Sequence, residues 1–168
     1  EPLKEKNLIN SIKSLSKISD KVSLQVKDQY EKNPYPRWRY TYSQISSPFL
    51  TKLERQIGPN KIKIQTQFDK PKILVAGCGT GQHSIGTSTR FKDSQTVAID
   101  LSLSSLAYAV RKTRELDIKN INYFHGDILD IRKLDKQFDI VESVGVLHHM
   151  SDPLLGWDIL TDCLKQGG

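Results

Sequence analysis

Residues 72–84, with the sequence KILVAGCGTGQHS, constrain the fold more than any other part of the chain. An apolar run at positions 73–76 leads directly into three glycines, Gly77, Gly79 and Gly81. Such a run is typical of a strand that is buried on both faces. Glycines let the backbone turn sharply and approach a ligand closely, and a helix that follows offers unpaired N–H groups. The segment therefore predicts a strand, a glycine turn that cradles a nucleotide, and a helix.

The spacing of the glycines narrows the class of ligand. A dinucleotide-binding turn has the pattern G-x-G-x-x-G, in which the last glycine would fall at position 82. That residue is Gln82, and the third glycine, Gly81, comes one position earlier. A strand-to-helix turn without a ligand also favours glycine, so the turn alone does not establish a binding site.

Length, charge and cysteine content indicate a single soluble domain. The 168 residues are enough for one sizeable core. The net charge is +6, but the lysines are spread along residues 4–72, so we expect a solvated basic surface and keep nucleic acid as a partner that is not favoured. No apolar run approaches the roughly 20 residues that span a bilayer, so we expect no membrane association. The two cysteines, Cys78 and Cys163, make no disulfide framework, which favours a reduced, cytoplasmic setting.

Apolar runs alternate with helical patterns after the glycine turn. We predict strands over 73–76, 96–100, 121–125 and 138–141, and helices over 82–91, 101–116 and 153–164. Strands that alternate with helices in this way form right-handed β-α-β units around a parallel sheet. The expected fold class is therefore α/β, with a doubly wound, mostly parallel sheet of which this chain supplies the first four strands.

The N-terminal region shows helical patterns of its own. Apolar residues at helical spacing predict a helix over 3–19. Asp20 is placed to cap a second helix, which should end before Asn33-Pro34. Ser47 and Pro48 would open a short helix that runs to residue 57.

Residues 30–42, YEKNPYPRWRYTY, interleave aromatic and basic side chains, and two prolines make the segment extended. Three interpretations compete: a strap packed on the domain, a lid or substrate wall, and a stacking platform for single-stranded nucleic acid. We expect a strap that also acts as a lid. The chain thus divides into an N-terminal helical and strap region, 1–69, and a cofactor-binding domain, 70–168.

Acidic residues follow two of the predicted strands, where ligands bind on parallel sheets. Asp100 ends the second strand, and a carboxylate there can accept both hydroxyls of a ribose. Asp127 follows the third strand, and the neighbouring Ile128 could cover the face of an adenine. The plainer alternatives are a helix-capping aspartate at position 100 and an empty turn at position 127.

The fourth strand leads into two adjacent histidines, His148 and His149. Neighbouring positions point in different directions and no third ligand stands at a useful spacing, so we predict no metal site. One histidine could face the cleft as a base or as an orienting group, and ordinary polar packing is the alternative.

Taken together, KILVAGCGTG, VAIDLS, FHGDILDI and FDIVESVGVLHHM resemble the S-adenosylmethionine-dependent methyltransferases with the Rossmann-like fold (class I), over about residues 70–168. The resemblance implies S-adenosylmethionine as the cofactor and methyl transfer to an unidentified acceptor, a small molecule or a protein. In that family the glycine turn holds the methionine part, the second-strand acid binds ribose, the third-strand acid lies beside adenine, and the fourth-strand segment lies beside the sulfonium methyl. The implied cofactor-binding residues are Ala76, Gly77, Cys78, Gly79, Gly81, Asp100, Leu101, Asp127, Ile128 and Ser143. The candidate bases, in order, are His148, His149 and Tyr35.

The chain departs from the family pattern in two respects. Family members commonly carry an acid at the position of Val75, where it helps to hold the cofactor's amino group. We therefore expect the amine to be held more weakly or by another group. The family's sheet has seven strands, three of which would follow Gly167-Gly168, and the chain begins without Met, so we expect part of a longer protein. The stretch YEKNPYPRW also resembles a segment ahead of this domain in bacterial methyltransferases, some of them joined to tetratricopeptide repeats.

Two other functions compete with methyl transfer. A cofactor-binding or scaffold fragment without catalysis is suggested by Val75 and by the early end of the sheet. A nucleotide-dependent oxidoreductase is suggested by Asp100, which also suits NAD, but Gln82 and the matches at Asp127 and His148 argue against it.

Overall fold

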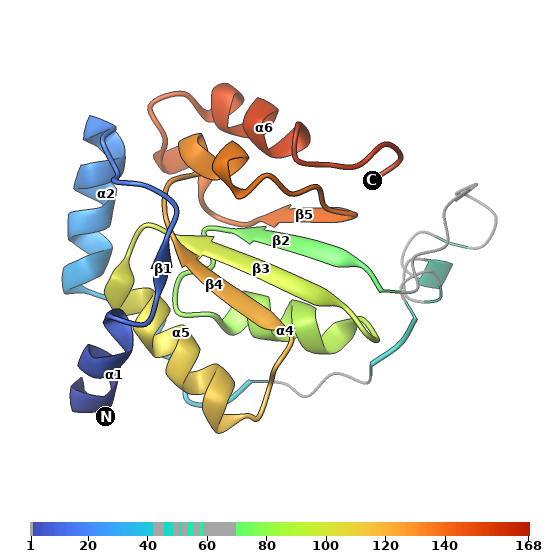
Figure 1. The fold of residues 1–168 in the computed structure, drawn as a ribbon, viewed down its shortest axis with the longest axis horizontal. Helices are drawn as coiled ribbons and strands as arrows, with labels where there is room; N and C mark the ends of the chain where they lie inside the picture. Colours follow the sequence, from blue (N-terminus) through green and yellow to red (C-terminus); the bar gives the residue numbers. More distant parts are fainter. Residues whose placement is uncertain (1, 42–45, 49–50, 52–53, 56–57, 59–69) are drawn as a thin grey trace.

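A parallel five-stranded sheet forms the centre of the computed structural model, which describes residues 2–41, 46–48, 51, 54–55, 58 and 70–168 (Figure 1). Its strands are β1 (Lys13–Ser14), β2 (Lys72–Ala76), β3 (Gln95–Asp100), β4 (Ile121–His125) and β5 (Ile140–Ser143). They lie in the order β1-β4-β3-β2-β5, and every neighbouring pair is parallel. The strand order reverses at β2, since β3 lies on one side of it and β5 on the other. The predicted α/β fold is confirmed.

Helices cover both faces of this sheet, as its alternating side chains require. Leu74 and Val97 belong to one apolar cluster, together with residues of η1 (Ile128–Leu134) and α6 (Pro153–Thr161). Ile73 and Ala98 face the other way, towards Phe91 at the end of α4 (Gln82–Arg90) and Leu106 of α5 (Leu103–Glu115). The predicted helices form within a few residues of their expected bounds, and α5 begins late because Ser102 caps it, accepting from Ser105 N–H at 3.1 Å.

The N-terminal region joins this sheet instead of forming one long helix. The prediction of a helix over 3–19 is wrong beyond α1 (Pro2–Ile9), because the chain turns and enters β1. Ser14 pairs in register with His125, and the N–H of Leu15 donates to the His125 carbonyl at 2.9 Å. The new strand satisfies backbone groups that β4 would otherwise expose at a sheet edge. Ile12 and Leu15, which have a helical spacing in the sequence, pack instead against two different apolar clusters of the domain.

The second N-terminal helix forms as predicted. It is α2 (Lys21–Lys32), and the Asp20 side chain caps it by accepting from Ser23 N–H at 2.8 Å. Of the predicted helix from Ser47 to residue 57, only Thr51, Glu54 and Arg55 are seen to be helical, and most other positions lie outside the described residues. Within the part of the chain that is described, no helix has both the length and the apolar character needed to cross a membrane.

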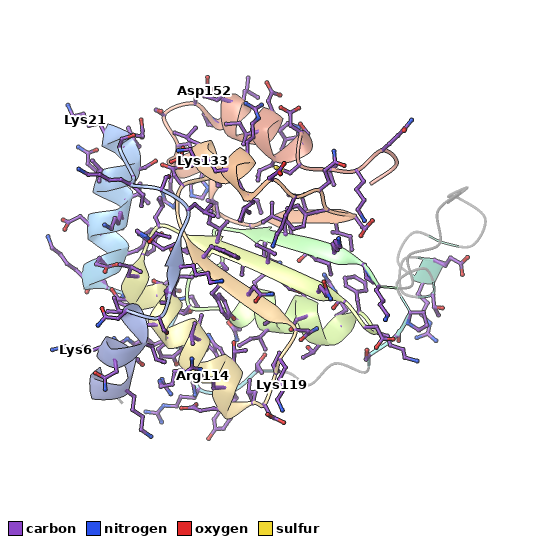
Figure 2. The ribbon with its side chains drawn as sticks, in the orientation of Figure 1. Lys6, Lys21, Arg114, Lys119, Lys133 and Asp152 are labelled. Carbon is purple, nitrogen blue, oxygen red and sulfur yellow. The ribbon has the colours of Figure 1, made fainter. Side chains whose placement is uncertain are left out.

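Exposed basic side chains come from several elements rather than from one. Figure 2 labels Lys6 on α1, Lys21 on α2, Arg114 on α5, Lys119 before β4 and Lys133 on η1, and they project outward around the molecule. This spread agrees with the solvated basic surface expected from the sequence.

Candidate functional site

The glycine turn after β2 adopts left-handed backbone angles, which favour glycine. Gly77, Gly79 and Gly81 have φ values of 74°, 53° and 87°. A Cβ on Gly77 would lie 2.2 Å from a methyl carbon of Val146, and one on Gly81 would lie 2.6 Å from the Cβ of Ala109. The turn therefore allows the chain to leave β2, to pack against α5, and to start α4 without a side chain in the way.

This turn forms one side of a pocket of about 370 Å³ at the carboxyl ends of β2, β3, β4 and β5. The predicted site residues that line it are Tyr35, Gly77, Cys78, Gly79, Asp100, Leu101, Asp127, Ile128 and His149. Four predicted residues do not line it: Ala76, Gly81, Ser143 and His148. The pocket lies at the point where the strand order reverses, which is where open parallel sheets bind their ligands.

Asp100 is held directly against the glycine turn. One carboxylate oxygen accepts from Gly79 N–H at 2.7 Å, and the other accepts from Ser102 N–H at 2.9 Å. Burial raises the pKa of this carboxyl, the backbone N–H groups of Ser102, Gly79 and Leu101 oppose that rise, and the nearby charge of Glu31 adds to it. A carboxylate has about four acceptor sites, so these backbone contacts are compatible with a further hydrogen bond from a ribose hydroxyl.

Asp127 and Ile128 lie at the end of β4, beside Asp100. The Asp127 side chain is 4% exposed and accepts from Leu129 N–H at 3.1 Å, which caps η1. Ile128 is buried and contributes an apolar wall. Gly126 N–H donates to the Asp100 carbonyl at 3.0 Å, so the ends of β3 and β4 are tied together.

The two histidines after β5 have different environments. His149 lines the pocket, where its Nε2 lies 3.4 Å from the hydroxyl of Tyr30, and the two rings meet edge to face at 6.1 Å. His148 is exposed, outside the pocket lining, with its ring 4.0 Å from that of His149. Of the three candidate bases, the structure thus brings His149 and Tyr35 to the pocket, but not His148.

The aromatic segment before the domain crosses the glycine turn. Trp38 is 7% exposed, and its ring N–H donates to the Thr80 carbonyl at 3.1 Å. The Thr80 hydroxyl donates to the Pro36 carbonyl at 2.5 Å, and the hydroxyl of Tyr108 donates to the Trp38 carbonyl. Tyr35 and Pro36 consequently form a wall of the pocket.

Several residues at the site were not predicted. The pocket is also lined by Val26, Tyr30, His83, Ser105 and Met150. Glu31 of α2 accepts from the Ser102 hydroxyl at 2.9 Å and so ties α2 to the start of α5. His83 is hydrogen-bonded to Glu142 of β5. No local pattern could reveal these pairs, because their members come from distant parts of the sequence. Across the described ranges, no group of three or more His, Cys, Asp or Glu side chains could hold a metal ion.

Comparison with known proteins identifies the domain. Residues 73–168, more than half of the chain, match the family model described as a methyltransferase domain. The chain belongs to this methyltransferase family. PKMT2 from Rickettsia typhi, solved in complex with AdoHcy, is 25% identical, with a TM-score of 0.58 over 80% of this chain and 25% of that one. An S-adenosylmethionine-dependent methyltransferase from Clostridium acetobutylicum shares the fold. It is 21% identical, with a TM-score of 0.55 over 86% of this chain and 54% of that one.

The curated relatives of this methyltransferase domain are longer proteins. An uncharacterized protein from Synechococcus is 29% identical over 90% of this chain but only 36% of its own length. The chain spans between about a quarter and a half of the first curated relatives that it matches. The resemblance of residues 30–38 to segments joined to tetratricopeptide repeats stays a prediction.

The residues present fit the cofactor of this family, S-adenosylmethionine, whose prediction is confirmed by the family match and by the PKMT2 complex. The turn at Gly77 and Gly79 carries no side chains, a carboxylate follows β3, and the pocket lining is largely apolar. The Ser105 hydroxyl also lines the pocket, is buried, and has no hydrogen-bond partner among the residues described. A buried hydroxyl without a partner is costly unless a ligand supplies one.

Proposed function

We propose that this protein transfers the methyl group of S-adenosylmethionine to an acceptor, and that the pocket at the strand ends is the site. The observation that carries the proposal is the contact of Asp100 with Gly79 N–H at 2.7 Å, inside a pocket formed by a methyltransferase domain. When bound, the cofactor supplies an electrophilic sulfonium methyl group. The protein has to bind the cofactor and the acceptor, align them with each other, and exclude water from the site.

Each predicted cofactor residue has a role in this proposal. Asp100 and Leu101 bind the ribose, and Asp127 and Ile128 flank the adenine, in agreement with their places after β3 and β4. The backbone of residues 77–79 borders the methionine part. Three predicted residues support the pocket wall without lining the pocket. Ala76 is fully buried, Gly81 precedes the first residue of α4, and the Ser143 hydroxyl is buried at the end of β5.

His149 is the group we assign to the acceptor. It lines the pocket, as does the exposed Tyr35, and its ring lies against that of Tyr30. An imidazole in this position can orient the acceptor's nucleophilic atom or accept its proton. His148 is outside the pocket lining, so it ranks after His149 as the base. Met150 and Val146 provide apolar surface that helps to exclude water.

The acceptor, a small molecule or a protein, is the protein's partner in this proposal. We also propose that the protein works in the cytoplasm. Both Cys78 and Cys163 are buried free thiols, which a reducing compartment preserves.

Calorimetric titration with S-adenosylhomocysteine tests the cofactor site. We expect micromolar binding by the wild type, no binding of NAD, and a loss of at least about tenfold in Asp100→Ala, which removes a charged hydrogen-bond acceptor. Asp158→Ala, an exposed carboxylate on α6, is the matched control and should bind like the wild type. A wild-type chain that is folded by circular dichroism and binds no S-adenosylhomocysteine would overturn the proposal.

A further inference from the structure

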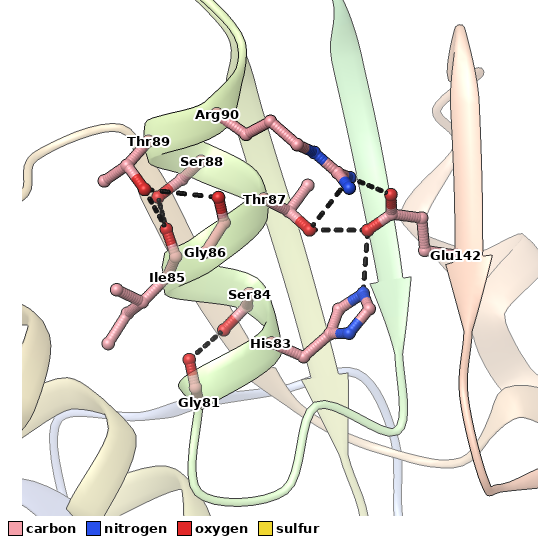
Figure 3. A network of polar contacts seen from close by, with 10 residues as sticks. All are labelled: Gly81, His83, Ser84, Ile85, Gly86, Thr87, Ser88, Thr89, Arg90 and Glu142. Carbon is pink, nitrogen blue, oxygen red and sulfur yellow. Dashed lines mark hydrogen bonds and ion pairs between the residues drawn. The ribbon is translucent and has the colours of Figure 1, made fainter. Parts of the chain in front are cut away.

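A charged network joins α4 to β5 at one end of the pocket (Figure 3). Glu142 of β5 accepts from His83 Nε2 at 2.8 Å and from the Thr87 hydroxyl at 2.5 Å, and it forms an ion pair with Arg90. Its side chain is only 18% exposed. His83, on the first turn of α4, is the member of this network that lines the pocket.

Glu142 fixes which atom His83 presents. Burial would raise the pKa of the Glu142 carboxyl, but hydrogen bonds from His83 and Thr87 and the charges of Arg90 and of His83 when it is protonated lower it to about 2. The group is therefore a carboxylate at neutral pH and can only accept hydrogen bonds, so Nε2 of His83 carries the hydrogen between them. In the neutral ring, Nδ1 is then an acceptor. No described residue hydrogen-bonds to Nδ1.

The position of His83 along the pocket indicates which part of a ligand it meets. The strands run β4-β3-β2-β5 across the pocket. Under the proposed function, on which this inference rests, adenine lies at β4 and ribose at β3. The amino-acid end must then extend towards β2 and β5, where His83 reaches Glu142. Val75 of β2, the register partner of Glu142, brings only an apolar side chain to this end.

We propose that His83, oriented by Glu142, binds the ammonium group of the amino-acid end of S-adenosylmethionine through Nδ1. The ammonium is a donor only, and it needs an acceptor at this end of a mostly apolar pocket. Arg90 offsets the charge of Glu142, so the ammonium donates a directed hydrogen bond to Nδ1 of His83 and does not meet an unpaired carboxylate. His83 is a binding residue, and Glu142 is a positioning residue that acts through it.

Two ligands that differ only at the amino-acid end separate this role from general support of the pocket. S-adenosylhomocysteine carries the amino-acid end, whereas 5′-methylthioadenosine lacks it. By calorimetry, His83→Ala should weaken S-adenosylhomocysteine about tenfold or more, as expected for a hydrogen bond to a charged group, and change 5′-methylthioadenosine less than about twofold. Thr89→Ala is the matched control on α4, since the Thr89 hydroxyl bonds only within that helix, and it should change neither affinity.

Conservative variants test the orienting role of Glu142. His83→Asn places an amide oxygen near the position of Nδ1 and should restore part of the lost affinity. Glu142→Gln should weaken S-adenosylhomocysteine and leave 5′-methylthioadenosine unchanged. An unchanged affinity for S-adenosylhomocysteine in His83→Ala, or an equal loss of both ligands, overturns this inference while leaving the proposed function standing. A wild type that binds neither ligand overturns both.

Discussion

Replacing Gly81 with alanine should destabilise the protein without touching any side chain of the pocket. Gly81 has φ of 87°, and a left-handed conformation costs a residue with a Cβ about 1–2 kcal/mol. The new Cβ would lie 2.6 Å from the Cβ and 3.1 Å from the Cα of Ala109. Because those atoms belong to the backbone of α5 or are fixed to it, relief requires a helix shift, and such overpacking costs about 1–3 kcal/mol. We expect a total loss of about 2–5 kcal/mol.

Urea unfolding followed by circular dichroism measures this change, and Gly86→Ala is its matched control. Gly86 lies within α4, has no positive φ, and would place a Cβ with no heavy atom inside 4 Å. Alanine there should stabilise the protein by up to about 1 kcal/mol, since glycine is the poorer helix former. A Gly81→Ala variant within about 0.5 kcal/mol of the wild type would refute the reasoning, because the spread among surface substitutions is that large.

Three further changes test other parts of the site. Trp38→Phe removes the donor to the Thr80 carbonyl, and we expect a loss of about 1–3 kcal/mol in urea unfolding; an unchanged midpoint would mean that the strap contributes no stability. Ser105→Ala removes a buried hydroxyl without a described partner, so the unliganded protein should be as stable or more stable, while S-adenosylhomocysteine affinity should fall; a loss of stability would show that the hydroxyl has a structural role. The pKa of Glu142 is lowered from 4.5 to about 2, so the carboxylate contributes stability above pH 4.5 that is lost as the pH falls towards 2. Glu142→Gln should lower the free energy of unfolding by about 3 kcal/mol at pH 7, and its difference from the wild type should disappear in acid. A difference that does not change with pH would contradict this linkage.

The sequence predicts what is encoded locally in this chain. The run from residue 73 to Gly81 specifies strand, turn and helix within a few positions, and Asp20 marks the start of α2 in the same way. The two-residue strand β1 shows no periodicity of its own, and only its pairing with β4 defines it. Backbone pairing with the exposed edge of β4 therefore determines the structure of this segment, although its apolar residues have a helical spacing.

Local sequence patterns could not predict contacts between residues that are far apart in the chain. His83 and Glu142 meet because β2 and β5 are neighbours in the sheet, and no spacing in the sequence encodes that register. Which of His148 and His149 faces the pocket depends on how η2 (Leu147–His149) turns after β5. The place of Asp100 beside the glycine turn could be predicted because strand and turn are both local, whereas Tyr30, the partner of His149, comes from a separate helix.

The pocket extends beyond the region that the family model matches. Residues 73–168 supply the glycine turn and the strand ends, but Val26, Tyr30 and Tyr35 line the same pocket from the N-terminal side. Glu31 fastens this side to the start of α5, next to Asp100. The residues proposed to bind the cofactor therefore come from the shared domain, whereas Tyr30, which contacts His149, comes from a segment outside the match. Under the proposed function, the acceptor meets this wall beside His149, so we infer that the N-terminal region contributes to the choice of acceptor.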